Sequence, residues 1–297
     1  MRMLVPEIPN LIHYAIPFFI ITLIIEIIVD ARERTNSYET KDTITSIAMG
    51  LGNVFLGLIS KTIVFGALIL IYDNFRLFTI PFAWWAWVLI LFAEDFSYYW
   101  FHRISHENRF FWASHVVHHS SQRYNLGTAL RQTWTGSFLS FVFWLWLPLL
   151  GFHPVMILAQ MSISLLYQYW IHTELIKKMP RWFEAAFNTP SHHRVHHATN
   201  PQYLDRNHAG IFIIWDKLFG TFEPEVEKPI YGLTKNIGSF NPLYVAFHEW
   251  KALFKDAFTS KTSFGKRLLY FIKPPGWRHD GTGMLASDLR KEWKKNT

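Results

Sequence analysis

The chain has 297 residues, half of them apolar and 18% aromatic, and its charged fraction is only 17%. That balance is more apolar than the surface of a soluble protein usually tolerates. Cysteine is absent, which excludes a disulfide framework, a thiolate zinc site, a cysteine-ligated iron–sulfur cluster and a thiolate-ligated haem. The net charge of +7 suits an anionic membrane surface or nucleic acid, and the long apolar segments favour the membrane.

Apolar segments predict four or five membrane-spanning helices. In chain order they are residues 11–29, 44–71, 82–101, 134–150 and 154–171. The first is too long for the apolar part of a signal peptide and lacks a small-residue cleavage site, so it is predicted to span the membrane. The last two are short for a span and are separated by the helix-breaking turn Gly151-Phe152-His153-Pro154. They form either a full hairpin or a pair that enters the bilayer partway.

The distribution of Lys and Arg orients these spans. Most of the Lys and Arg residues lie in residues 102–132 and 172–297, whereas the loop 73–81 contains only Arg76. The positive-inside rule therefore predicts that the N-terminus lies outside and that these two basic segments lie in the cytoplasm. With 134–171 as a hairpin, both segments emerge on the same side of the membrane, as a site shared between them requires.

The chain after about Pro180 is less hydrophobic and is predicted to form a cytosolic cap of short helices. Within this cap, Leu243 to Phe258 reads as an amphipathic helix, which either lies on the bilayer surface or packs as an ordinary surface helix. We therefore predict an all-α integral membrane protein with a single membrane-embedded catalytic domain, residues 1–297, and a catalytic core at 83–225. Its location is the bacterial inner membrane or the endoplasmic reticulum, with the site facing the cytoplasm.

Histidines are concentrated in two short segments. Residues 102–119 contain His102, His106, His115, His118 and His119, and residues 192–197 contain His192, His193, His196 and His197. Packing does not explain these clusters, because neighbouring core histidines would each need a hydrogen-bond partner. One pair has i, i+4 spacing and two HxxHH motifs have i, i+3 and i+4 spacing, so three helical segments each present histidines on one face.

Eight of these imidazoles fit two metal ions better than one, because one ion takes three or four histidines and keeps a position open. The predicted catalytic and metal-binding set is His102, His106, His115, His118, His119, His193, His196 and His197. The third helix of this set is predicted to begin at Thr189 as N-cap, with Pro190 in the first position, and to end at Asn200-Pro201. His192 points away from the shared face.

Two further histidines are candidate ligands. His172, at the exit of the last predicted span, is added to the metal-binding set, and His208 is a weaker candidate. Glu94 and Asp95 lie before His102 in an apolar helix, where buried carboxylates are costly and usually functional. We expect them to accept a hydrogen bond from a ring N–H and so to fix its tautomer. The alternative is an ion pair with Arg103.

Around these histidines the sequence resembles the fatty acid hydroxylase / sterol desaturase superfamily. The resemblance covers roughly residues 83–225 and rests on EDFSYYWFHR at 94–103, WASHVVHHSS at 112–121, YNLGTALRQ at 124–132, WIHTE at 170–174, TPSHHRVHH at 189–197 and WDKLFGTF at 215–222. These stretches, together with Pro274-Pro275-Gly276-Trp277, are most similar to the alkylglycerol monooxygenase branch of the superfamily.

The resemblance implies a non-haem diiron centre, O2 as a substrate, and oxidation of a C–H bond in a membrane lipid. For the alkylglycerol monooxygenase branch it implies cleavage of an ether lipid with a reduced pterin as electron donor. The chain has neither a dinucleotide-binding fingerprint nor a haem-attachment motif, so the electrons are expected from a separate protein or a small reductant. Zinc is the alternative metal in purified protein, since imidazole suits zinc as well as iron.

Other functions stay open at this point. Within the superfamily, the alternative is a sterol or fatty-acyl hydroxylase or desaturase. From a different class, a zinc-dependent membrane hydrolase would need neither electrons nor O2. A metal transporter would have its histidines near the middle of the spans rather than at their ends. No nucleic-acid partner is expected.

Overall fold

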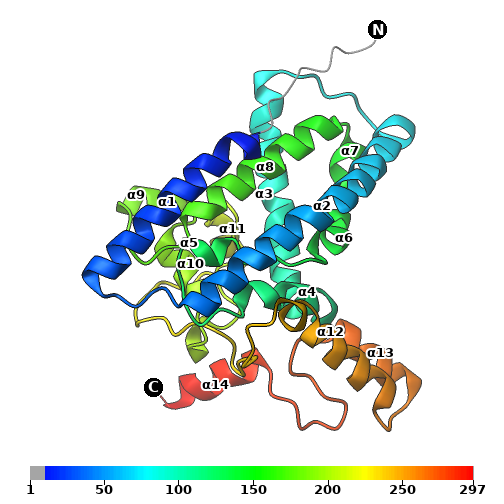
Figure 1. The fold of residues 1–297 in the computed structure, drawn as a ribbon. Coiled ribbons are helices and arrows are strands. Elements are labelled where there is room, and N and C mark those ends of the chain that lie inside the picture. Colours follow the sequence, from blue (N-terminus) through cyan, green and yellow to red (C-terminus); the bar gives the residue numbers. More distant parts are fainter. Residues whose placement is uncertain (1–10, 297) are drawn as a thin grey trace.

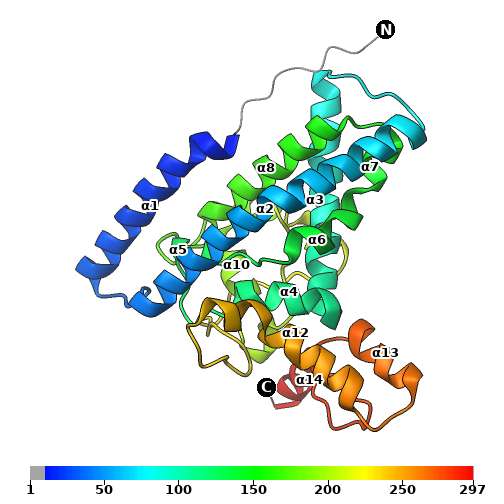
Figure 2. The ribbon, with the colours of Figure 1, turned by 45° about the vertical axis from the view of Figure 1, so that its right-hand side comes forward.

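The computed structural model describes residues 11–296, whose secondary structure is helical apart from two isolated β-bridges, Phe187–Phe212 and Ala198–Tyr231. This confirms the predicted all-helical class. The main helices of the bundle are α1 (Leu11–Glu33), α2 (Thr40–Phe75), α3 (Trp84–Glu107) and α8 (Pro154–Trp170). Helices α1 and α2 both pack on α8, and the three run in similar directions, while α3 crosses them (Figures 1 and 2).

Helices α1 and α2 are long and apolar enough to cross a membrane. Large apolar side chains on both are exposed, among them Ile21 on α1 and Leu51 and Phe55 on α2. Exposed apolar area of this extent indicates a lipid environment, so the protein is a membrane protein. The predicted spans 82–101 and 154–171 fall within α3 and α8, and their crossing of the membrane stays a prediction. The first ten residues, which the topology prediction puts outside, lie outside the described part of the chain.

The segment 134–150 is not the single helix that the sequence predicts. It consists of α6 (Gly136–Ser140), a 3-10 turn η1 (Phe141–Trp144) and α7 (Trp146–Leu150). The indole N–H of Trp144 donates to Glu94 Oε1 at 3.2 Å, and that of Trp146 donates to Ser97 Oγ at 2.8 Å. Both indoles are thus hydrogen-bonded to polar groups of α3. The segment follows the surface of α3 and does not continue as one straight helix.

Short helices gather at the end of the bundle where α3 and α8 terminate (Figure 1). They are α4 (Arg109–His119), α5 (Leu126–Ala129), α9 (Arg181–Ala186), α10 (Pro190–His196), the 3-10 turn η2 (Pro201–Tyr203), α11 (Ile214–Leu218), α12 (Pro242–Thr259), α13 (Phe264–Ile272) and α14 (Ala286–Asn296). The predicted cap of short helices is therefore present.

A sharp turn at Asn108 brings α3 and α4 together. Asn108 is extended, and its side-chain oxygen accepts hydrogen bonds from the amides of Phe110 at 3.0 Å and Phe111 at 3.4 Å. The cap satisfies amides that have no partner within the new helix, so α4 begins at once in a new direction. The histidines of α3 and α4 consequently face one another.

The predicted orientation can be tested with single cysteines, because the natural chain has none. Asn74 lies at the end of α2 away from the short helices, and Lys291 lies on α14. A membrane-impermeant thiol reagent applied to intact cells should label Asn74→Cys, and should label Lys291→Cys only after permeabilisation. Labelling in the reverse pattern would invert the proposed topology.

Candidate metal centre

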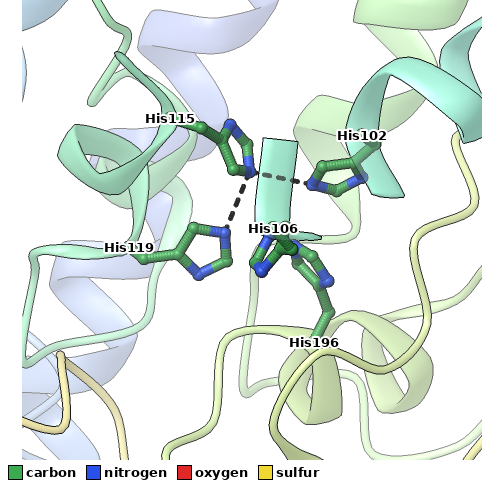
Figure 3. Close-up of side chains that lie close together, drawn as sticks. All are labelled: His102, His106, His115, His119 and His196. Atoms are coloured by element: carbon green, nitrogen blue, oxygen red, sulfur yellow. Dashed lines mark hydrogen bonds between the residues drawn. The ribbon is translucent and has the colours of Figure 1, made fainter. Parts of the chain in front are cut away.

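Five histidines from three helices form the first group of ring nitrogens (Figure 3). They are His102 and His106 on α3, His115 and His119 on α4, and His196 on α10, and one ring nitrogen of each lies within 4.8 Å of the others. The Nε2 atom of His115 lies 3.0 Å from that of His102 and 3.1 Å from that of His119. The Nε2 atoms of His106 and His196 are buried without a hydrogen-bond partner.

Four more histidines form the second group. They are His118 on α4, His172 after α8, His193 on α10, and His197 directly after α10, again within 4.8 Å of one another. The Nε2 atom of His172 lies 3.1 Å from that of His118 and 3.0 Å from that of His193, and the Nε2 atoms of His193 and His197 are 3.2 Å apart. The structure thus brings together all eight histidines of the predicted set and also His172.

Burial disfavours the charged form of eight of these imidazoles, His102, His115, His118, His119, His172, His193, His196 and His197. Loss of hydration, aided by the neighbouring histidines, lowers the pKa of His102, His115 and His193 well below 6.5. Burial likewise lowers the pKa of His118 to about 4. At neutral pH each of these eight rings therefore carries one proton and one lone pair.

Backbone carbonyls decide which ring nitrogen carries the proton. The Nδ1 atom of His102 lies 2.8 Å from the carbonyl oxygen of His208, that of His172 lies 2.7 Å from the oxygen of Gln168, and that of His118 lies 3.3 Å from the oxygen of Arg131. A carbonyl can only accept, so Nδ1 is the protonated nitrogen and Nε2 presents its lone pair.

In the second group, the lone pairs of His118 and His172 therefore face one another at 3.1 Å. Such an arrangement is repulsive unless a cation lies between the nitrogens. Two imidazole nitrogens that bind a first-row metal at roughly 2.1 Å and at right angles to each other lie about 3.0 Å apart. The observed separations of 3.0–3.2 Å fit that arrangement, so the nine histidines fit two metal ions, one in each group.

A loop at residues 206–216 positions two rings of the first group. Besides His208, it supplies the carbonyl oxygen of Arg206, which lies 3.0 Å from His196 Nδ1. The carboxylate of Asp216 accepts the amides of His208 and Ala209, both at 2.8 Å, and so holds the loop in place. Sequence reasoning missed Asp216 as a positioning residue, although it lies in the WDKLFGTF stretch.

The predicted role of Glu94 and Asp95 is wrong. Asp95 accepts hydrogen bonds from the amides of Ile211 at 2.6 Å and Phe212 at 3.0 Å and from the indole of Trp215 at 2.9 Å, so it holds the same loop rather than a histidine ring. Glu94 accepts from the indole of Trp144. The alternative pairing with Arg103 is wrong as well, because Arg103 bonds to Glu107 at 3.0 Å. The hydrogen-bond partner of a carboxylate on α3 depends on which segment packs against that side of the helix, and spacing along the helix does not predict this segment.

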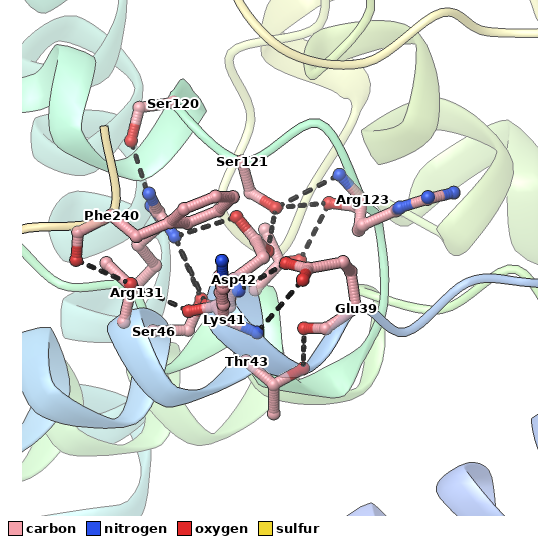
Figure 4. A network of polar contacts seen from close by, with 12 residues as sticks. Glu39, Lys41, Asp42, Thr43, Ser46, Ser120, Ser121, Arg123, Arg131 and Phe240 are labelled. Carbon is pink, nitrogen blue, oxygen red and sulfur yellow. Dashed lines mark hydrogen bonds and ion pairs between the residues drawn. The ribbon is translucent and has the colours of Figure 1, made fainter. Parts of the chain in front are cut away.

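A buried ion pair fixes the second group to α2 (Figure 4). The Nη1 atom of Arg131 lies 3.1 Å from Asp42 Oδ1 and 3.2 Å from Ser46 Oγ, and its Nε donates to Ser120 Oγ at 2.8 Å. Arg131 is 1% exposed, and its own carbonyl faces His118 Nδ1. Removing one partner of such a buried pair typically costs about 3–5 kcal/mol, so the position of this carbonyl is strongly determined.

The remaining candidate histidines lie outside both groups. His208 is fully buried and neither of its ring nitrogens has a hydrogen-bond partner, yet its ring centre is 5.1 Å from that of His106. His192 lies against Phe222, with ring centres 5.5 Å apart, which agrees with its predicted direction away from the site. The helix α10 begins at Pro190 as predicted but ends at His196, before Asn200-Pro201.

A cavity of about 920 Å³ adjoins the first group. Its lining includes four histidines of the groups, namely His106, His119, His196 and His197. The segment 232–237, α12, α14 and the segment between α13 and α14 also contribute. The lining combines apolar side chains such as Trp277 and Leu285 with charged ones such as Glu249 and Arg290. The histidines are therefore reachable from a chamber that suits an amphiphilic molecule.

Comparison with known proteins identifies related chains. Residues 87–221 match the fatty acid hydroxylase family. The chain is 42% identical over 275 residues to the alkylglycerol monooxygenase of Danio rerio. The aligned region covers 92% of the chain and 61% of that relative. It is 41% identical over 289 residues to the enzyme of that name from Homo sapiens, covering 96% of the chain and 63% of the relative. The chain thus spans about three fifths of the length of these relatives. No solved structure matches it significantly.

The two histidine groups predict two separable metal ions. Elemental analysis of the purified protein should give one ion for each group. The double variants His115→Ala/His119→Ala and His193→Ala/His197→Ala should each lose one of the two, because each removes ligands from a single group. His279→Ala, which alters a histidine outside both groups, should lose none. Full metal content in both double variants would contradict the assignment.

The loop contacts predict a selective effect of Asp216→Asn. An amide can no longer accept both backbone N–H groups as the carboxylate does, so the carbonyl that faces His102 should shift. Metal affinity of the first group should fall by roughly 10–100-fold, as is typical for an outer hydrogen-bond partner, while the second group keeps its ion. Competition with a chelator measures both affinities, and Asp288→Asn on α14 is the control.

Proposed function

We propose that the protein is a membrane-bound, O2-dependent diiron oxygenase that oxidises a C–H bond of a lipid, because residues 87–221 match the fatty acid hydroxylase family. One observation carries the proposal: nine buried imidazoles bring one ring nitrogen each into two small groups beside a cavity. Imidazole suits iron, zinc and copper alike. The family supports iron, with zinc as the alternative in purified protein.

The two groups would each hold one ion. His102, His106, His115, His119 and His196 would bind the first, and His118, His172, His193 and His197 the second. When bound, two irons supply the capacity to activate O2 with two electrons for attack on a C–H bond.

The chain's own residues orient and shield this chemistry. The carbonyls of His208, Gln168 and Arg131 hold the Nδ1 protons of three rings, so their Nε2 atoms keep one direction. All nine rings are buried to at least nine tenths. Exclusion of bulk water strengthens electrostatic interactions at the site and limits side reactions of reactive species.

The lipid is proposed to be an ether lipid of the alkylglycerol type. The relatives from Danio rerio and Homo sapiens are named alkylglycerol monooxygenase, and the mixed lining of the cavity suits a molecule with a polar head and an apolar chain. A sterol or fatty-acyl lipid is the alternative substrate within the superfamily. A zinc-dependent hydrolase is the alternative from another class.

Electrons are proposed to come from outside the chain, from a reduced pterin or from a separate donor protein. The proposed site faces the cytoplasm, because the basic segments 102–132 and 172–297 carry the histidines. A water-soluble donor would then meet the cavity from the aqueous side, while the lipid comes from the bilayer.

The activity should require both O2 and the histidines. His118→Ala, His119→Ala and His196→Ala should each abolish turnover, since a rigid helix cannot move another imidazole into the vacated position. Each variant should still insert into the membrane, because the apolar helices and not the metal determine insertion. His279→Ala should retain activity. The assay follows product from alkylglycerols, then from sterols and fatty-acyl lipids, with a supplied reductant.

Comparison of air with nitrogen separates the candidate functions. Equal product formation under nitrogen would identify a hydrolase and refute the oxygenase proposal. A requirement for O2 with inert alkylglycerols would keep the oxygenase and reject the ether-lipid substrate.

A further inference from the structure

Helices α12 and α13 form a hairpin, joined at residues 260–263, that projects sideways from the bundle. In both views the hairpin runs across the direction of α1 and α2, the two helices that are long and apolar enough to cross a membrane (Figures 1 and 2). Its position is therefore that of an element lying along a bilayer surface rather than through it.

One narrow side of α12 is apolar and exposed. Leu243 is 63% exposed and Phe258 is 67% exposed, with Phe247 and Phe254 between them at 43% and 44%. Their spacing of i, i+4, i+11 and i+15 puts all four on the same side of an α-helix. The opposite side packs inward, where Leu253 and Ala257 are buried against Ala113 of α4.

Helix α13 carries a second stripe of the same kind. Phe264, Leu268 and Ile272 follow one another at i, i+4 and i+8 and are 75%, 46% and 61% exposed. Phe271 joins the two stripes, since its ring centre lies 5.9 Å from that of Phe254 and 6.5 Å from that of Phe258. The hairpin thus presents one continuous apolar surface, which a monomeric protein in water rarely exposes.

Charges on the hairpin are arranged for an anionic partner. Its two acidic residues, Glu249 and Asp256, both pair with Arg109 of α4 at 2.8 Å and are turned inward. Its basic residues are Lys251, Lys255, Lys261, Lys266, Arg267 and Lys273. Lys251 and Lys255 are exposed beside the apolar stripe of α12. Long basic side chains in that position reach lipid headgroups while the apolar stripe enters the acyl region.

The hairpin begins at the level where α2 first presents apolar side chains outward. Val245 and Ala246 of α12 pack on Met49 of α2, and Thr45 donates to the carbonyl of Phe240 at 2.9 Å. Ile47 and Leu51, on the same stretch of α2, are exposed. The apolar surface of the hairpin is therefore continuous with a helix that is itself a candidate membrane span.

We propose that the α12–α13 hairpin is a membrane-docking element that rests on an anionic phospholipid surface, with its apolar stripes in the acyl region and its lysines at the headgroups. Helix α12, through Tyr244 and Glu249, lines the cavity beside the histidines. Docking would therefore hold the cavity at the bilayer surface. The docking does not depend on the proposed oxidation, and either can fail without the other.

Site-specific fluorescence on the full-length protein tests the proposal. Phe258→Cys and Phe264→Cys are labelled with bimane and reconstituted in vesicles of phosphatidylcholine and phosphatidylglycerol. Quenching by nitroxide-labelled phospholipid is compared with quenching by iodide in the water. Lys291→Cys is the matched control, since the Lys291 side chain is 74% exposed and Phe264 is 75% exposed. The lipid nitroxide should quench most of the fluorescence of both hairpin labels. Iodide should quench most of the fluorescence of the label at position 291.

Each other outcome overturns the proposal. Iodide quenching of the hairpin labels equal to that of the control would place the hairpin in water. Protection from both quenchers would mean that a second copy of the chain or another protein covers the surface. Equal nitroxide quenching when phosphatidylglycerol is left out would refute the role assigned to the lysines. Because the two labels lie on different helices, misfolding of one variant leaves the other as a test.

Discussion

The site depends on one electrostatic constraint: buried imidazoles, whose charged form burial disfavours, bring ring nitrogens within 3.0–3.2 Å of one another. A protonated ring would relieve one contact, but burial and neighbouring rings disfavour the proton, as the pKa of about 4 for His118 illustrates. A cation in each group would offset the repulsion that remains. The surrounding backbone is arranged to keep this situation in place, because carbonyls hold the Nδ1 proton and leave Nε2 without one.

Helical periodicity was sufficient to predict which rings face the site. His102 and His106 on α3, and His115 and His119 on α4, share a group because side chains at i and i+4 leave a helix on one side. The same rule does not say that His118, next to His119, joins a different group. That division arises from the angle between α3, α4 and α10, which depends on the turn at Asn108 and on tertiary packing.

Features set by contacts between distant segments could not be predicted. The carbonyls of Arg206 and His208 reach their rings only because Asp95 and Asp216 hold the intervening loop. Spacing along α3 suggested that Asp95 would face a histidine, yet backbone amides of the loop occupy its carboxylate. The interruption of the predicted helix 134–150 has a similar origin. The indoles of this segment form hydrogen bonds with polar groups of α3, and a hydropathy pattern does not predict such contacts.

Assembly of the site is shared between metal-independent and metal-dependent interactions. The pair Arg131–Asp42 and the cap at Asn108 bring α2, α3 and α4 together without using any histidine ring. Asp95 and Asp216 do the same for the loop that faces α10. Since these contacts already place nine ring nitrogens at short separations, an arriving metal ion needs to reorganise little. The binding site is therefore preformed, although the ring nitrogens within it repel one another. Buried polar contacts elsewhere in the chain, which involve no metal ion, offset this repulsion.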